Sequence, residues 1–119
     1  MVMRLEEIYN FFQNPPPTFI GPELTVCYLL SVLLQRDTYA TELVLHVENT
    51  YPNLQLSDTV LYTAIRFLEV EQAITGYWQR VGGRGRPRRM YRLVPQWQAR
   101  ATELAELWQN YVNESVLSN

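Results

Sequence analysis

Seven of the ten basic residues in this sequence fall in one interval that contains no acidic residue, between Glu71 and Glu103. All seven are arginines, and most of them lie in the short stretch GGRGRPRRMYRL, residues 82–93. A guanidinium stays charged at any physiological pH, and its planar fork can make two parallel hydrogen bonds to one phosphate group. The stretch therefore indicates binding to a polyanion.

The charge of the whole chain conceals this cluster. The formal net charge is −2 and the isoelectric point is about 5.4. Residues 1–71 hold three arginines and nine acidic residues, whereas residues 72–119 hold seven arginines and three acidic residues, and the chain has no lysine. A local patch of one sign sets the electric field that a charged partner meets, so a polyanion is a suitable partner for this acidic protein.

Two segments rich in aromatic and β-branched residues, 73–81 and 89–94, flank the glycines and prolines as the strands of a hairpin would. Their connection is longer than the favoured two residues, so we expect its tip to project. The run RGRP, residues 84–87, resembles the core of the AT-hook, a motif of narrow DNA minor grooves, where negative potential is concentrated. The alternative is a solvated hairpin tip with no binding role. The candidate DNA contacts of the hairpin are Arg84, Arg86, Arg88 and Arg89.

The helix predicted before this hairpin carries a second candidate surface. Ser57-Asp58-Thr59-Val60 is a typical helix start, with a capping hydroxyl and a carboxylate in the first turn, and the helix should end near Glu71. Its apolar face consists of Leu61, Ala64, Ile65 and Leu68. Its other face carries groups that suit phosphates and base edges in a major groove, namely Thr59, Tyr62, Thr63 and Arg66. An ordinary amphipathic helix with a polar outer face explains this stripe equally well.

Other helices must position these two surfaces. Residues 3–13 form a short amphipathic pattern before the break Asn14-Pro15-Pro16-Pro17, and residues 23–35 are apolar nearly all round, which predicts a buried central helix. After a cap at Arg36-Asp37-Thr38, a further helix should run to Tyr51-Pro52 with Tyr39, Leu43 and Val47 at four-residue spacing. The order of elements predicts a mainly α protein with a small β-hairpin, a winged helix-turn-helix with an N-terminal helical arm.

Pro95 should open a C-terminal helix whose apolar residues recur at spacings of four, three, four and three. The pattern predicts a dimer contact over residues 97–112, to which the arm could add by packing on its own body or on the partner subunit. Two tryptophans of this seam could line a pocket for a flat effector, but packing is favoured and no effector is indicated. The seam residues are Trp97, Ala101, Leu104, Trp108 and Tyr111.

The length suits one domain with a single modest core. Within it we distinguish residues 1–22 as helical arm and proline linker, residues 23–94 as the winged helix-turn-helix DNA-binding domain, and residues 95–119 as the dimerisation helix.

Other chemistry is not indicated. Cys27 lies in an apolar run, and His46 has no cysteine near it, so neither a disulfide nor a metal site is expected. No serine lies in a nucleophile motif and no phosphate-cradling loop is present, so we expect no enzymatic activity and no cofactor. Glu6 and Glu7 stand where a signal peptide would need an apolar core, and no apolar run is long enough to cross a membrane, so we expect a cytoplasmic protein.

Several spaced motifs resemble the PadR family of bacterial transcriptional regulators. They are LSDTVLYTAIRFLE at residues 56–69, Ile74, and GRPRRMYRL at residues 85–93, and the resemblance covers roughly residues 24–95. In that family a recognition helix with a Leu-Tyr pair precedes a wing rich in Gly, Arg and Pro that ends in Tyr-Arg-Leu. This chain departs from the pattern at Thr38, where Gly is usual, and at Val94, where Thr is usual. The single short C-terminal helix is similar to that of a compact subgroup of the family. The arm with its proline break, the run SDTVLY at residues 57–62 and the wing sequence GRGRPRRMY at residues 83–91 together suggest a cyanobacterial branch, which includes a repressor connected with the circadian clock.

The resemblance implies a regulator that binds double-stranded DNA as a homodimer, most simply a repressor that blocks a promoter at a palindromic operator. The rival from another class is a winged-helix module for protein–protein interaction, in which the basic hairpin binds an acidic partner surface.

Overall fold

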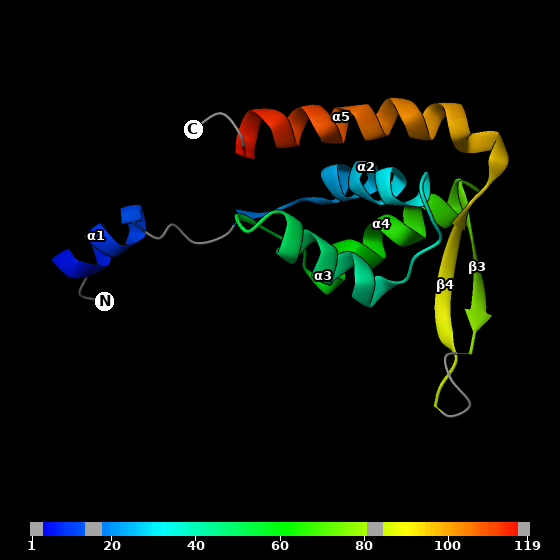
Figure 1. Cartoon of the computed structure of the whole chain (residues 1–119), viewed down its shortest axis with the longest axis horizontal. Helices are drawn as coiled ribbons and strands as arrows, with labels where there is room; N and C mark the ends of the chain where they lie inside the picture. The colour runs from blue at the N-terminus through cyan, green and yellow to red at the C-terminus, as the bar shows by residue number, and fades with distance from the viewer. Residues whose placement is uncertain (1–3, 14–17, 81–84, 117–119) are drawn as a thin grey trace.

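The computed structural model describes residues 4–13, 18–80 and 85–116. The predicted fold class, a mainly α winged helix with one small hairpin, is confirmed (Figure 1). In chain order the elements are α1 (Leu5–Gln13), β1 (Thr18–Phe19), α2 (Pro22–Leu33), α3 (Ala40–Thr50), β2 (Leu54–Gln55), α4 (Asp58–Val70), β3 (Ile74–Gln79), β4 (Arg88–Leu93), the 3-10 turn η1 (Pro95–Trp97) and α5 (Gln98–Val116).

Helix α2 forms the centre of the core, as its nearly continuous apolar sequence predicts. Tyr28, Leu29 and Leu30 are almost completely buried, and α2 packs against α4 on one side and α5 on the other (Figure 1). Burial of these side chains and of the facing leucines is the main favourable contribution to folding. Helix α4, which carries one of the two candidate DNA-binding surfaces, is therefore packed directly against the core.

Helix α4 begins where the sequence predicts. The Ser57 hydroxyl oxygen accepts a hydrogen bond from the backbone N–H of Val60 at 3.2 Å, which satisfies one of the orphan donors of the first turn. Its predicted apolar face is buried in the core at Leu61, Ala64, Ile65 and Leu68. The opposite face is therefore left for solvent or a ligand.

The cap predicted for α3 is wrong. Tyr39 is the N-cap residue, without a side-chain cap, and Thr38 instead exchanges two backbone hydrogen bonds with Tyr91 of β4, at 3.2 and 2.8 Å. Burial in this bridge leaves the Thr38 hydroxyl without a hydrogen-bond partner among the described residues. A second feature that the sequence patterns missed is the short parallel pair of β1 and β2, which joins Thr18 to Leu54.

Strands β3 and β4 pair antiparallel from Ile74↔Leu93 to Gln79↔Arg88. The pair projects from the helical body (Figure 1), and we call the strands and their connection, residues 74–93, the wing. Residues 81–84 of the connection, whose tip the sequence predicts to project, lie outside the described residues. Gly85 in the connection has φ +105°, a value that side-chain-bearing residues rarely adopt.

Helix α5 covers α2 with the residues that the sequence assigned to a seam between subunits. Ala101 and Trp108 are completely or almost completely buried within the single chain. The Trp108 ring packs against the rings of Tyr28, Tyr51 and Tyr111, with centroids 5.2, 5.5 and 5.9 Å away. The C-terminal helix therefore completes the core of its own subunit.

The arm helix α1 differs from α5 in this respect. It lies apart from the helical body (Figure 1), and its apolar residues are exposed, with Leu5 at 66% and Tyr9 at 63%. None of the described helices is long and apolar enough to cross a membrane.

Candidate nucleic-acid interface

The polar face of α4 is open to solvent, as a surface that reads DNA must be. Thr59, Tyr62, Thr63 and Arg66 are all exposed. Among them, Thr63 donates its hydroxyl proton to the Thr59 carbonyl one turn earlier, at 2.8 Å. No ion pair involves Arg66 within the described residues, so its guanidinium is available to a phosphate or a guanine edge.

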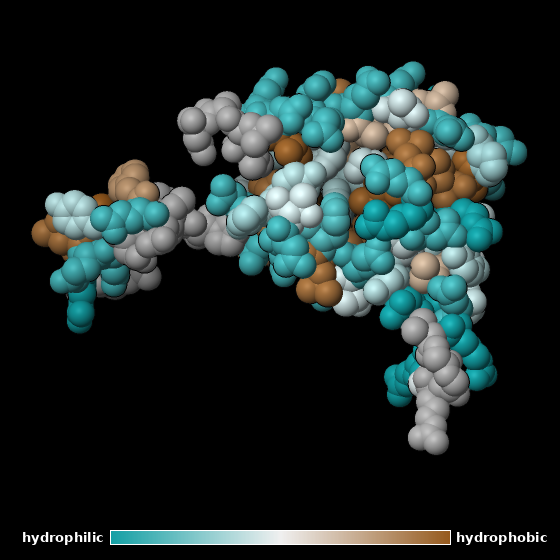
Figure 2. Space-filling view, in the orientation of Figure 1, coloured by the Kyte–Doolittle hydropathy of each residue, from teal (hydrophilic) through white to brown (hydrophobic). Residues whose placement is uncertain are grey.

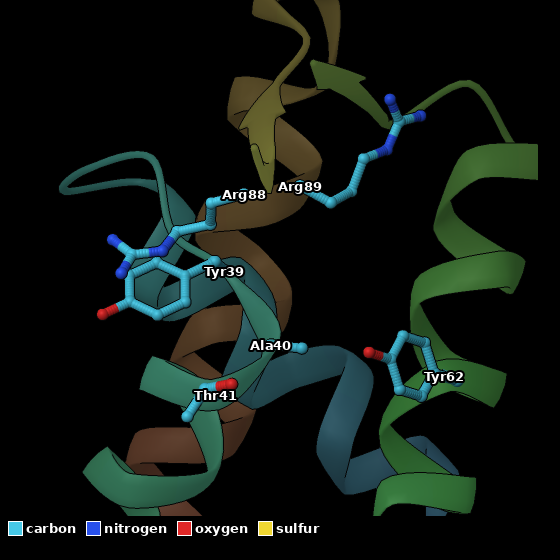
Figure 3. Close-up of a pocket in the computed structure, with 6 residues that line it drawn as sticks. All are labelled: Tyr39, Ala40, Thr41, Tyr62, Arg88 and Arg89. Atoms are coloured by element: carbon cyan, nitrogen blue, oxygen red, sulfur yellow. The ribbon is translucent and has the colours of Figure 1, made fainter. Parts of the chain in front are cut away.

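A hollow of about 300 Å³ joins this face to the wing (Figure 3). The start of α3 forms one wall, Tyr62 of α4 forms the facing wall, and the start of β4 lies above both (Figure 3). The lining residues are Tyr39, Ala40, Thr41, Tyr62, Arg88 and Arg89. Three elements that are separate in the sequence thus bring hydroxyls and guanidinium groups together.

Arg88 is held in place by an aromatic ring. Its guanidinium carbon lies 3.8 Å from the centroid of the Tyr39 ring, a close cation–π contact (Figure 3). Below it, the first turn of α3 has no side-chain cap, so backbone N–H groups at the positive end of the helix dipole lack a capping partner. A fixed cation above uncapped N–H groups is an environment that favours a phosphate.

Arg89 leaves β4 on the opposite side, because neighbouring residues of a strand alternate in direction (Figure 3). Its guanidinium lies 3.9 Å from the Glu69 carboxylate and 5.1 Å from the Trp78 ring centroid. It also lies across Gly76, where an added Cβ would come within 2.5 Å of it. Arg89 therefore contacts its own subunit, which limits its availability to a phosphate.

Asp37 ties the base of the wing to the body. Its carboxylate accepts hydrogen bonds from the Tyr77 hydroxyl at 2.6 Å and from the Arg92 guanidinium at 3.0 Å. The first of these bonds is the main reason that the pKa of Tyr77 is raised, because the bond needs the protonated phenol. Together with the Thr38 bridge to Tyr91, this cluster fixes both strands against the loop before α3.

These contacts correct one expectation from the sequence. The absence of acidic residues from the arginine interval predicts a cluster without neutralising partners, but Glu69 and Asp37 reach Arg89 and Arg92 from other elements. Among the described residues, neutralisation is confined to the paired strands of the wing: Arg86, in the connection between them, is exposed and makes no ion pair there. Arg84 lies outside the described residues.

The predicted α4 face divides into two sides. Tyr62 lines the hollow beneath the wing, whereas Thr63 borders a separate, mainly apolar groove beside α2 and α5. Of the predicted seam residues, Ala101 and Trp108 are buried in their own chain, and Trp97, Leu104 and Tyr111 are half-buried against the same core. The seam residues therefore leave less apolar surface for contact with a second subunit than their heptad spacing predicts.

The sequence patterns missed three residues of this site: Asp37, Tyr39 and Thr41. The four-residue spacing of Tyr39, Leu43 and Val47 predicts a helix, and the position of Asp37 predicts a cap. The available signal was the position of Tyr39 and Thr41 at the start of a helix that the sequence leaves without a strong capping residue. Their meeting with Arg88 depends on long-range packing, which local spacing does not encode.

The remaining candidate groups are structural. The Tyr28 hydroxyl donates to the Leu43 carbonyl at 3.0 Å and lies 2.9 Å from Nδ1 of His46, and burial lowers the His46 pKa. Burial also raises the pKa of the Cys27 thiol, which disfavours the reactive thiolate. Among the described residues, no three His, Cys, Asp or Glu side chains lie close enough to hold a metal ion.

The chain matches the model of one protein family and resembles several solved structures. The model of the transcriptional regulator PadR-like family matches residues 29–103. The crystal structure of the circadian clock associated protein Pex from Anabaena is 56% identical, with a TM-score of 0.88, over 98% of this chain and 100% of that chain. Pex from Synechococcus has the same identity and TM-score over 92% of this chain and 98% of that chain. A comparison with curated protein sequences found no match.

A PadR family transcription regulator from Clostridium difficile, 20% identical with a TM-score of 0.59, has the same fold over 79% of this chain and 97% of that chain. The two structures at 56% identity agree with the cyanobacterial branch that the sequence motifs suggested. Both motifs, residues 56–69 and 85–93, lie inside the region that the family model matches. The chain belongs to the PadR-like family of transcriptional regulators.

Proposed function

We propose that this DNA-binding regulator acts as a homodimer on a palindromic operator and represses transcription by blocking a promoter. The observation that carries the proposal is the hollow in which Arg88, Tyr39 and Tyr62 converge from the wing, α3 and α4. It places a fixed cation next to an open helix face, which is the combination that a DNA backbone and groove require. A cytoplasmic location is part of the proposal.

In this mechanism α4 enters the major groove, where Thr63 and Arg66 read base edges and Thr59 and Tyr62 bind phosphates. The wing binds the flanking DNA backbone or minor groove through Arg84, Arg86 and Arg88. Arg89 supports the wing through Glu69 and Trp78 and contributes less to the grip. Two-fold symmetry places the half-sites about one or two helical turns apart.

Dimerisation uses the side of α5 that borders the apolar groove beside α2 and α4, together with α1. Leu104 is only half-buried and Leu107 is 57% exposed, so α5 still has apolar surface to offer. The buried pair Ala101 and Trp108 supports this surface from inside the subunit.

The salt dependence of binding tests the proposal. If a dimer neutralises roughly eight phosphates, the logarithm of the association constant should fall against the logarithm of salt concentration with a slope of about −7. A slope of about −1 to −2 would reject the wing as the anchor. Selection of bound fragments from random DNA at physiological salt should yield a palindrome; failure to bind any DNA while an acidic protein is bound would favour the interaction module.

A further inference from the structure

Trp78 on β3 is a large aromatic side chain that the fold leaves open. Of the three tryptophans in the sequence, Trp108 is 1% exposed and Trp97 is half-buried against the core, whereas Trp78 is 65% exposed. Tryptophan is highly buried on average in folded proteins, because its large ring gains much from removal from water. Most of the Trp78 side chain is therefore available to a partner.

The strand register places Trp78 on the side of the wing that faces α4. Trp78 pairs directly with Arg89, and paired residues send their side chains to the same face of a ladder. The Arg89 guanidinium lies 5.1 Å from the Trp78 ring centroid and 3.9 Å from the carboxylate of Glu69 on α4. This face of the wing is therefore turned toward α4. Trp78 extends it outward, since only the pair Gln79↔Arg88 lies beyond it in the ladder.

A DNA duplex that contacts both candidate surfaces must pass this face of the wing. In the proposed function α4 enters the major groove, and the wing binds the flanking backbone or minor groove. The sugar–phosphate strand that separates the two grooves then lies between α4 and the wing, on the side where Trp78 is exposed. The deoxyribose rings are the apolar part of that strand, and their C–H groups can make many dispersion contacts with a flat indole.

The charge around Trp78 favours a nucleic acid over an apolar protein surface. No acidic residue occurs in the sequence between Glu71 and Glu103, and exposed Arg80 follows Trp78 on the same strand side of the hairpin. Figure 2 shows mainly hydrophilic residues over the described part of the wing that this view presents. A single indole among arginines is not the contiguous apolar patch of a protein interface, whereas aromatic and basic side chains together are typical of nucleic-acid-binding surfaces.

We propose that Trp78 contacts DNA directly, with its indole packed on the deoxyribose rings of the strand between the two grooves. The inference rests on the placement of α4 and the wing in the proposed function. It adds an apolar contact to a wing whose other DNA contacts are charged. Such a contact releases no counterions, so it strengthens binding by the same factor at low and high salt, whereas the contribution of the arginines falls as salt rises.

The cation–π contact supplies the alternative, in which Trp78 acts only by orienting Arg89. A double-mutant cycle separates the two. Trp78→Ala should weaken binding to every DNA sequence by about 10-fold without changing the salt slope. In an Arg89→Ala background, Trp78→Ala should cause the same loss of about 10-fold, because a contact with deoxyribose does not need the guanidinium. Titration of operator and unrelated fragments at several salt concentrations measures both quantities.

Two further variants serve as controls. Trp78→Phe keeps a flat ring at the same place, so it should recover most of the affinity that Trp78→Ala loses. Thr75→Ala changes an exposed residue of the same strand, but Thr75 pairs with Arg92 and leaves the opposite face of the ladder. It should alter the affinity by less than about 2-fold. Circular dichroism of each variant shows whether the chain remains folded.

Quenching of tryptophan fluorescence by acrylamide tests the contact in the wild-type chain. Because Trp78 is the most exposed of the three tryptophans, the difference between wild type and Trp78→Phe isolates its signal. Saturating DNA should lower the quenching constant of this signal by at least about 3-fold, since the indole is removed from solvent. The signal of Trp97 and Trp108, measured in Trp78→Phe, should change little.

The outcomes that would overturn the contact are distinct. A loss in Trp78→Ala that disappears in the Arg89→Ala background would show that Trp78 only orients Arg89. A wild-type chain that binds DNA while Trp78 is quenched as strongly as in the free protein would reject the contact and leave the proposed function standing. A wild-type chain that binds no DNA would reject the proposed function itself. The quenching measurement decides the question even where the alanine variant does not fold.

Discussion

The wing and α4 both present polar side chains to the solvent, but the fold holds them differently. Along β4 of the wing, Arg89 and Arg92 pair with Glu69 and Asp37, and Arg88 stacks on Tyr39. On the exposed face of α4, Arg66 makes no ion pair within the described residues. The wing is thus fixed in direction by its own subunit, whereas the helix side chains remain free to adjust.

This difference suits two different tasks. A guanidinium that is already oriented loses little conformational entropy when it meets a phosphate, and phosphate contacts set the register of a protein on DNA. Side chains that read base edges must adapt to donors and acceptors that change with sequence. We therefore propose that affinity depends mainly on the wing and sequence preference mainly on α4.

The largest expected effect comes from removing the wing charges that remain available. Arg86→Ala combined with Arg88→Ala should weaken binding to all DNA sequences by about 100-fold and make the salt slope shallower by about 3 to 4, since four phosphate contacts are lost per dimer. Titration at several salt concentrations measures both. Arg100→Ala, an arginine on α5 that stacks on Trp97, is the matched control and should change little. A loss of affinity for only one DNA sequence would contradict the proposed difference between the wing and α4.

A smaller and more selective effect is expected on α4. Arg66→Ala or Thr63→Ala should lower the affinity for the preferred sequence by about 10-fold while binding to unrelated DNA stays the same. Selection from random DNA should then return a changed consensus at the corresponding position. Equal losses on every sequence would mean that these residues hold the backbone, as the wing does.

The base of the wing should affect geometry more than charge. Asp37→Asn weakens the bonds to Tyr77 and Arg92, so the midpoint of thermal unfolding should fall by about 3 °C. Because the substitution removes a negative charge, an electrostatic role alone would strengthen DNA binding. A several-fold weaker affinity with an unchanged salt slope would show that Asp37 acts by fixing the wing.

The smallest expected effect concerns His46 on α3, which belongs to neither the wing nor α4. Burial lowers the His46 pKa in the folded chain below its ordinary value of 6.5, so the unfolded chain takes up a proton first as the pH falls. The free energy of unfolding should therefore decrease as the pH falls below about 6.5, and this part of the decrease should be absent in His46→Gln. Chemical denaturation at several pH values measures it. An identical pH dependence in both proteins would contradict the assignment.

Much of the site follows from local sequence. The Ser57 cap, the apolar stripe of α4 and the projecting hairpin were all predicted correctly, because capping, helical period and turn chemistry each act within a few residues. The prediction of a helix cap at Thr38 was wrong because a long-range contact decides the conformation there. Its backbone pairs with Tyr91, more than fifty residues later in the chain, and this tertiary contact overrides the local preference.

The sequence by itself determined that this protein carries an arginine-rich hairpin next to a polar helix face, since charge, glycine and helical period are properties of short segments. The tertiary structure decided which arginines are neutralised, that Tyr39 supports Arg88, and that α5 covers its own core with Ala101 and Trp108. The physical reason is that periodicity identifies which residues will be buried or paired. Which residues they contact depends on elements that only folding brings together.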